Sequence, residues 1–175
     1  MFDFSTNAVR PEAAVFLATV WQGLAYLCEQ VEQMEKERAK SLGLNFAGTD
    51  FGNQPDDWLV CNYFVWYGNA LSNFIGVFAK AFSVSEDLEA AFANVITWRN
   101  KVAAHTSWVS PRGDNAATQD MSIVLFPEFN FGHFAVGGVR VFSADTGESS
   151  PDWRWGLVRT HERLKEIVSK YASAI

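Results

Sequence analysis

The residues best suited to chemistry lie together in the segment 98–106 (WRNKVAAHT). Arg99 is followed directly by Asn100, and five residues separate Arg99 from His105. A histidine can move a proton near neutral pH because its ordinary pKa is about 6.5, and an arginine offers an anion a planar, permanently charged fork. Six steps along an ideal helix turn about 600°, so the two side chains would project about 120° apart. They meet on one ligand only if the helix ends or kinks before His105, or if a second copy completes the site.

This segment resembles the signature of the HEPN superfamily, in which an arginine with a polar follower precedes a histidine by about four to six intervening residues. The resemblance covers the expected helical part of the chain, roughly 11–108 and 151–173. It implies a metal-independent ribonuclease without a cofactor, acting as a homodimer in which two motifs line one cleft. It also implies a place in toxin–antitoxin or phage-defence systems, with an antitoxin or another protein as partner.

The resemblance gives each residue of the motif a role on RNA. His105 would be the acid or base when a ribose 2′-OH attacks the adjacent phosphate, and Arg99 would hold the charge that develops on the phosphoryl oxygens. Asn100 would orient the ribose or the phosphate. Other expected substrate contacts are Lys101, Trp108 and Arg112, with Trp108 stacking on a base and Arg112 contacting a phosphate.

Further polar residues fall on the faces of neighbouring helices. Asn62, Asn69 and Asn73 share one face of a helix, which is either the exposed side or the polar wall of a cleft. His161 lies on the apolar stripe of the last helix, where a core histidine is the default and a place in the same cleft is the alternative. His133 is expected on a surface strand.

Two other interpretations of the motif remain open. Arg99 and His105 could be a charged face and a helix end, in which case the bundle is a catalytically silent module that binds a protein or RNA. The aromatic-rich interior could instead enclose a small molecule, which predicts a closed apolar cavity.

Helical spacing of apolar residues, together with start and stop signals, predicts four helices. The expected helices cover residues 11–43, 55–82, 83 to about 105–108, and 149 to about 173. The third is expected to start at a capping box, Ser83 to Glu86. The charged stretch 32–40 (EQMEKERAK) is expected to be a solvated helix end.

A change of composition after residue 120 predicts β-structure. Strand-type sequence covers 121–126, 133–136 and 139–143, and Gly137-Gly138 suits a two-residue hairpin turn. We therefore predict a mainly α fold: an up-and-down four-helix bundle with a small β-meander, about 121–143, inserted before the last helix. One domain is expected to span 1–175.

Composition narrows the function classes. Of 175 residues, 49% are apolar, which supplies enough material for a core and argues against disorder. The net charge of −6 disfavours a strongly basic, general nucleic-acid binder.

Two cysteines without metal-type spacing predict no metal site and a reduced, cytoplasmic location. Residues 58–79 carry no charge, but their asparagines would need partners inside hydrocarbon, so we expect a buried helix and no membrane.

Overall fold

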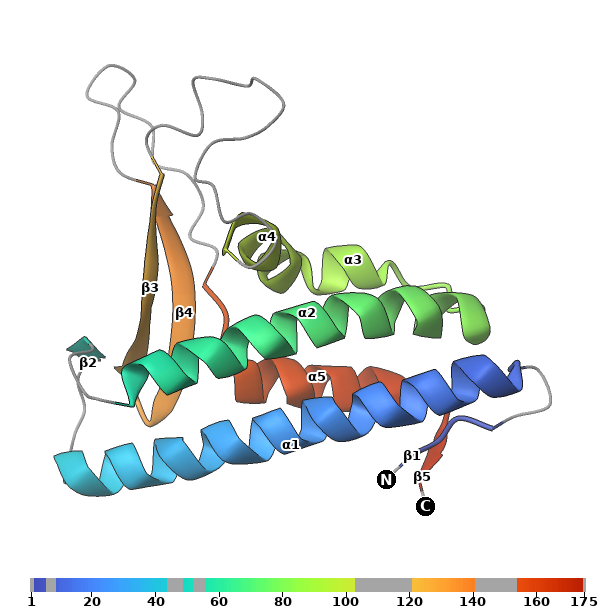
Figure 1. The fold of residues 1–175 in the computed structure, drawn as a ribbon, viewed down its shortest axis with the longest axis horizontal. Helices are drawn as coiled ribbons and strands as arrows, with labels where there is room; N and C mark the ends of the chain where they lie inside the picture. The colour runs from blue at the N-terminus through green and yellow to red at the C-terminus, as the bar shows by residue number, and fades with distance from the viewer. Residues whose placement is uncertain are drawn as a thin grey trace.

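The computed structural model confirms the mainly helical fold with a small sheet before the last helix (Figure 1). It describes residues 2–5, 9–43, 49–51, 56–102, 121–140 and 154–174. The helices are α1 (Pro11–Leu42), α2 (Asp57–Ala81), α3 (Leu88–Ala91), α4 (Ala93–Val102) and α5 (Leu157–Val168). The strands are β1 (Phe2–Asp3), β2 (Thr49–Phe51), β3 (Met121–Asn130), β4 (His133–Arg140) and β5 (Ser173–Ala174).

The two long helices agree with their sequence signals. Pro11 occupies the first turn of α1, where its missing N–H costs nothing, and Gly43 with a φ of 89° follows the last helical residue. Along the chain, α1, α2, the α3–α4 segment and α5 reverse direction in turn (Figure 1). The predicted up-and-down arrangement is therefore confirmed.

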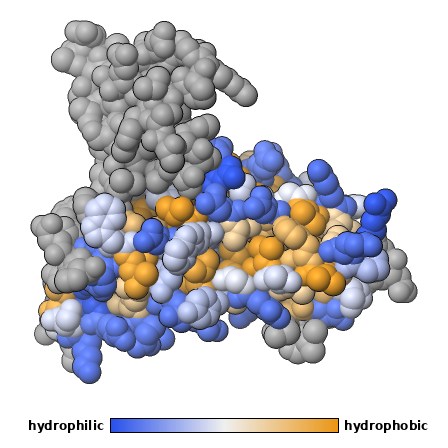
Figure 2. All heavy atoms as spheres, viewed as in Figure 1, coloured by the Kyte–Doolittle hydropathy of each residue, from blue (hydrophilic) through white to orange (hydrophobic). Residues whose placement is uncertain are grey.

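The core is built largely from the inner face of α2. Phe64, Tyr67, Leu71, Phe74 and Phe78 recur at helical spacing and are fully buried. Figure 2 shows hydrophobic residues in a band over α2 and its border with α1, with hydrophilic residues on either side. Within the described ranges, no helix combines the length and the hydropathy that a membrane crossing needs.

The third predicted helix differs from the expectation in two ways. It is divided at Phe92 into the short α3 and the longer α4. Its start is also wrong, because the carboxylate of Asp87, not the Ser83 hydroxyl, accepts the N–H of Ala90 at 3.0 Å. Ser83 has a φ of 50° and closes α2 instead, with the N–H of Val84 bonded to the carbonyl of Ala79.

The predicted hairpin turn at Gly137-Gly138 is wrong. Strand β4 continues through both glycines, and the turn lies at Phe131-Gly132, between the paired residues Asn130 and His133. Phe131 and Gly132 have φ values of 48° and 86°. Positive φ at both central residues is typical of a two-residue turn that matches the twist of its strands.

Three strands, β1, β2 and β5, were not predicted from the sequence. Strand β2 comes from the connection after α1 and pairs with β3, so the sheet has the order β2-β3-β4. Strand β1 pairs with β5 and holds the two ends of the described chain together.

The hairpin stands at the end of the bundle where α1 ends and α2 and α5 begin (Figure 1). An isolated bridge between Val136 and Trp155 ties the hairpin to the segment before α5. The expected span of the last helix, 149 to about 173, is too long: Trp155 pairs with Val136, Gly156 precedes the first helical residue, and α5 covers only Leu157–Val168, while 149–152 lie outside the described residues.

Candidate functional site

The guanidinium of Arg99 is held between α4 and α2 by two amide oxygens. Its Nε donates to Oδ1 of Asn69 at 3.0 Å, and its Nη1 donates to Oδ1 of Asn100 at 2.8 Å. Helix α4 packs on α2 at Gly68, where a Cβ would lie 3.5 Å from the Cβ of Arg99 and 3.7 Å from Cγ1 of Val95, which are ordinary contact distances. The structure thus brings together Arg99, Asn100 and Asn69, which the sequence placed in one candidate site.

The other motif residues have no described side-chain geometry. Lys101 lies on α4, but its side chain is not described, and His105, Trp108 and Arg112 lie outside the described residues. Asn73 is on α2 with an exposed side chain. The meeting of Arg99 and His105 therefore stays a prediction.

His161 lies in the core. Its Nδ1 is 3.1 Å from the hydroxyl of Tyr67, and its ring lies 5.1 Å from that of Trp21. The pKa of this imidazole is lowered to about 4, chiefly by burial and also by the nearby Lys165, while Glu32 acts in the opposite direction. At neutral pH His161 is an uncharged packing residue, as its place on the apolar stripe of α5 indicated.

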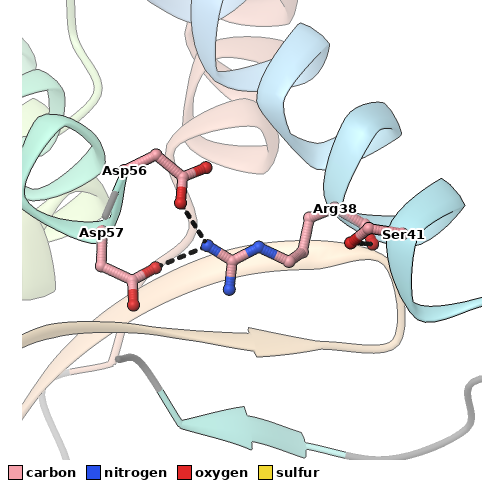
Figure 3. Close-up of polar contacts among 4 residues, drawn as sticks. All are labelled: Arg38, Ser41, Asp56 and Asp57. Carbon is pink, nitrogen blue, oxygen red and sulfur yellow. Dashed lines mark hydrogen bonds and ion pairs between the residues drawn. The ribbon is translucent and has the colours of Figure 1, made fainter. Parts of the chain in front are cut away.

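The prediction that stretch 32–40 is solvated is wrong for Glu35 and Arg38, which are both buried. One nitrogen of Arg38, Nη2, donates to Asp56 at 2.8 Å and to Asp57 at 2.7 Å, and so joins α1 to the start of α2 (Figure 3). The guanidinium also lies 5.4 Å from the ring centre of Phe134. The signal was present in the sequence, because both positions continue the three- and four-residue spacing of the apolar face.

Glu35 links α1 to the tip of the hairpin. Its Oε1 accepts the backbone N–H of Phe134 at 2.8 Å, and its Oε2 is 3.1 Å from Nδ1 of His133. Burial raises the pKa of this carboxyl, while the Phe134 hydrogen bond and His133 act against that rise. His133 is half exposed, as expected of a surface strand, but its carboxylate partner could not be found from residues 98 positions apart.

Neither cysteine has the properties of a nucleophile. Cys28 and Cys61 are both buried and form no disulfide. Burial raises the pKa of each thiol to about 12, so the reactive thiolate is suppressed at neutral pH. Among the residues that the structure describes, no group of three or more His, Cys, Asp or Glu side chains is placed to hold a metal ion.

Comparison with protein-family models, with curated proteins and with solved structures gives no match for this chain. The described part of the chain thus offers the Arg99 guanidinium, oriented by Asn69 and Asn100, and the Glu35–His133 pair as polar groups for a candidate site.

Proposed function

We propose that this chain is a metal-independent endoribonuclease of HEPN type that uses Arg99 to bind the phosphate at the cleavage point. The observation that carries the proposal is the fixed guanidinium of Arg99, held by Asn69 and Asn100. The resemblance of 99–105 to the HEPN signature gives that guanidinium its substrate.

The surroundings of Arg99 suit an anion. Its two described partners are neutral amides, and no carboxylate among the described residues pairs with it. Within this part of the chain, two of its five N–H groups are engaged and fix its orientation, which leaves the others to contact a ligand. An arginine held in this way loses less conformational entropy when it binds a phosphate, which favours tight and oriented contact.

In the proposed reaction the ribose 2′-oxygen attacks the adjacent phosphorus and its proton passes to a base, the role we assign to His105. The P–O5′ bond breaks, and the leaving oxygen takes up a proton. The products are a 2′,3′-cyclic phosphate and a free 5′-OH. Arg99 stabilises the charge that grows on the phosphoryl oxygens, and Asn100 keeps the guanidinium in place.

The experiment is RNA cleavage in EDTA by the wild type and by Arg99→Ala, Arg99→Lys and His105→Ala. We expect the alanine variants to lose activity by about 10²-fold or more, since each removes a group that acts in the transition state. Arg99→Lys should recover little, because lysine lacks the planar fork. Arg10→Ala, which removes an exposed arginine at the start of α1, is the matched control.

Each variant is first checked for an unchanged fold by circular dichroism and thermal unfolding. Cleavage that ends in 2′,3′-cyclic phosphate and is lost only in the motif variants supports the proposal. Equal background in all variants, on several RNA types, contradicts it.

A specific observation also favours the homodimer, in which two motifs would line one cleft. Leu59 and Trp66 on α2 are 43% and 52% exposed, and Tyr63 packs against Trp66. An exposed apolar face of this kind is typical of a protein contact. We propose a second copy of the chain as its occupant, because Asn69 lies one turn beyond Trp66 and pairing across α2 would bring two Arg99 clusters to one interface.

Light scattering tests this proposal. We expect a dimer for the wild type and a monomer for Trp66→Lys, with Tyr26→Lys as the control for an exposed aromatic residue on α1. A wild type that stays monomeric at high micromolar concentration would rule out this interface.

A further inference from the structure

Two adjacent hollows lie over the start of α5. One, of about 400 Å³, is lined by the hairpin tip and α5, with Phe131 and His133 on one side. The other, of about 370 Å³, lies between α5 and the α3–α4 segment. They share the lining residues Arg154, Trp155, Gly156 and Arg159, so together they form one groove, which we call the arginine groove.

Among the described residues that line the second hollow, three are arginines and none is acidic. Arg154 forms an ion pair with Glu128. Arg159 and Arg163 have no carboxylate partner among the described residues, and Arg163 lies over the ring of Phe92 at 5.8 Å. Because Arg159 and Arg163 are four residues apart on α5, they lie on the same face of the helix. This part of the surface is therefore locally basic, although the chain has a net charge of −6.

The backbone adds donors at the same place. Gly156 caps α5 without a side chain, and a Cβ there would lie 3.3 Å from the carbonyl oxygen of Phe134, so the hairpin packs tightly against the helix start. Within the described part of the chain no side chain accepts the first N–H groups of the helix, and the helix start, at Gly156, lines both hollows with the positive end of the helix dipole. Trp155, which lines both hollows, is buried, and its indole N–H has no acceptor within the described part of the chain.

An aromatic ring stands at the other end of the groove. Phe131 is 70% exposed at the tip of the hairpin, and its φ of 48° is unfavourable for a bulky residue. Asn, Asp or Gly would fit this exposed turn better, so the turn itself does not require the phenyl ring. Basic grooves with aromatic platforms are the usual arrangement for binding single-stranded nucleic acid.

We propose that the arginine groove binds the phosphate groups of a nucleotide ligand, with the phosphates at Arg159 and Arg163 and a base against Phe131. Glu35 lines the first hollow and bonds there to His133 and to the N–H of Phe134; because a carboxyl group disfavours a phosphate beside it, we assign the phosphates to the second hollow. The shared chemistry is a phosphate beside a planar base, offered either by an RNA strand or by a free nucleotide. The proposal needs neither Arg99 nor His105, so it goes beyond the proposed function.

The experiment measures the binding of a labelled 12-nucleotide single-stranded RNA, in EDTA and at several salt concentrations, by fluorescence anisotropy. A parallel titration uses AMP. The variants are Arg159→Ala, Arg163→Ala and the double variant, with Arg10→Ala as the charge-matched control. Each lost phosphate contact should weaken binding about tenfold and lower the slope of log affinity against log salt by about 0.7.

A second variant, Phe131→Asn, removes the ring and keeps a residue that tolerates positive φ. We expect it to weaken RNA binding about tenfold and leave the salt slope unchanged, because stacking involves no phosphate. A much higher affinity for the RNA than for AMP identifies the strand as the ligand, and similar affinities identify the free nucleotide. Either result supports the site if the arginine variants lose that binding.

Arginine variants that bind both probes like the wild type, with the same salt slope, overturn the proposal. The two proposals can also be told apart. If Arg99→Ala loses cleavage but still binds RNA, the binding site in the groove is supported independently of the nuclease. If the double variant at Arg159 and Arg163 cleaves RNA with an unchanged KM, the nuclease is supported and the groove proposal is contradicted.

Discussion

The Arg38 cluster and the arginine groove place the same side chain in opposite surroundings. Arg38 has a side chain only 5% exposed and donates to two aspartates at the start of α2. Arg159 and Arg163 lie along an open groove, and no described carboxylate neutralises them. An arginine paired with buried carboxylates stabilises the fold. An arginine beside a hollow, without a described carboxylate partner, is available to bind a ligand.

The comparison predicts its largest effect at Arg38. Arg38→Met should lower the free energy of unfolding by about 3–5 kcal/mol, because it leaves the carboxylate of Asp57, which is 2% exposed, without this guanidinium. Urea unfolding measures the loss. Lys36→Met is the control, since the Lys36 side chain is 72% exposed and its pair with Glu32 is long, at 3.8 Å. Similar small losses in both variants would contradict the structural role of Arg38.

The histidines also differ in burial, and the buried His161 predicts that the stability of the fold depends on pH. His161 in the folded chain stays neutral down to about pH 4, while the ordinary pKa is 6.5, so protons bind the unfolded chain first as the pH falls. Stability from this group is therefore present above pH 6.5 and is lost between pH 6.5 and 4, by about 3 kcal/mol in all. His133, half exposed beside Glu35, has no such burial.

Unfolding curves of the wild type and His161→Gln across that pH range measure the effect. The variant should be less stable at pH 7, because it disturbs the packing around Tyr67, and should lose less stability on acidification. Parallel pH curves for the two proteins would show that another group is responsible.

The helices could be predicted from the sequence because their signals are local. Apolar spacing and the residues Pro11 and Gly43 mark α1 without reference to the rest of the chain. The break at Phe92 and the turn at Phe131-Gly132 could not be predicted, because local signals pointed elsewhere: to a capping box at Ser83 and to a glycine pair now inside β4. Packing between distant elements decides such cases.

The candidate site, like the fold, could be predicted only where its signals are local. Arg99 and Asn69 were both identified, each from the face of its own helix, and the 3.0 Å contact between them is what the structure adds. The arginine groove was missed, because its lining comes from the hairpin tip, the α3–α4 segment and α5, which lie far apart in the sequence. The Glu35–His133 pair was missed for the same reason.

The smallest effect is expected at Arg159, and it is the sharpest test of the comparison. Arg159→Ala should change the free energy of unfolding by no more than about 0.5 kcal/mol, because no described ion pair is lost and the exposed alanine favours the helix. Arg163→Ala should cost slightly more, about 0.5–1 kcal/mol, because its contact with the ring of Phe92 is lost. Urea unfolding of both variants beside Arg38→Met measures the three values together. A loss at Arg159 as large as that at Arg38 would mean that Arg159 has a structural partner, and the groove would then lose the free charge on which its binding of phosphate depends.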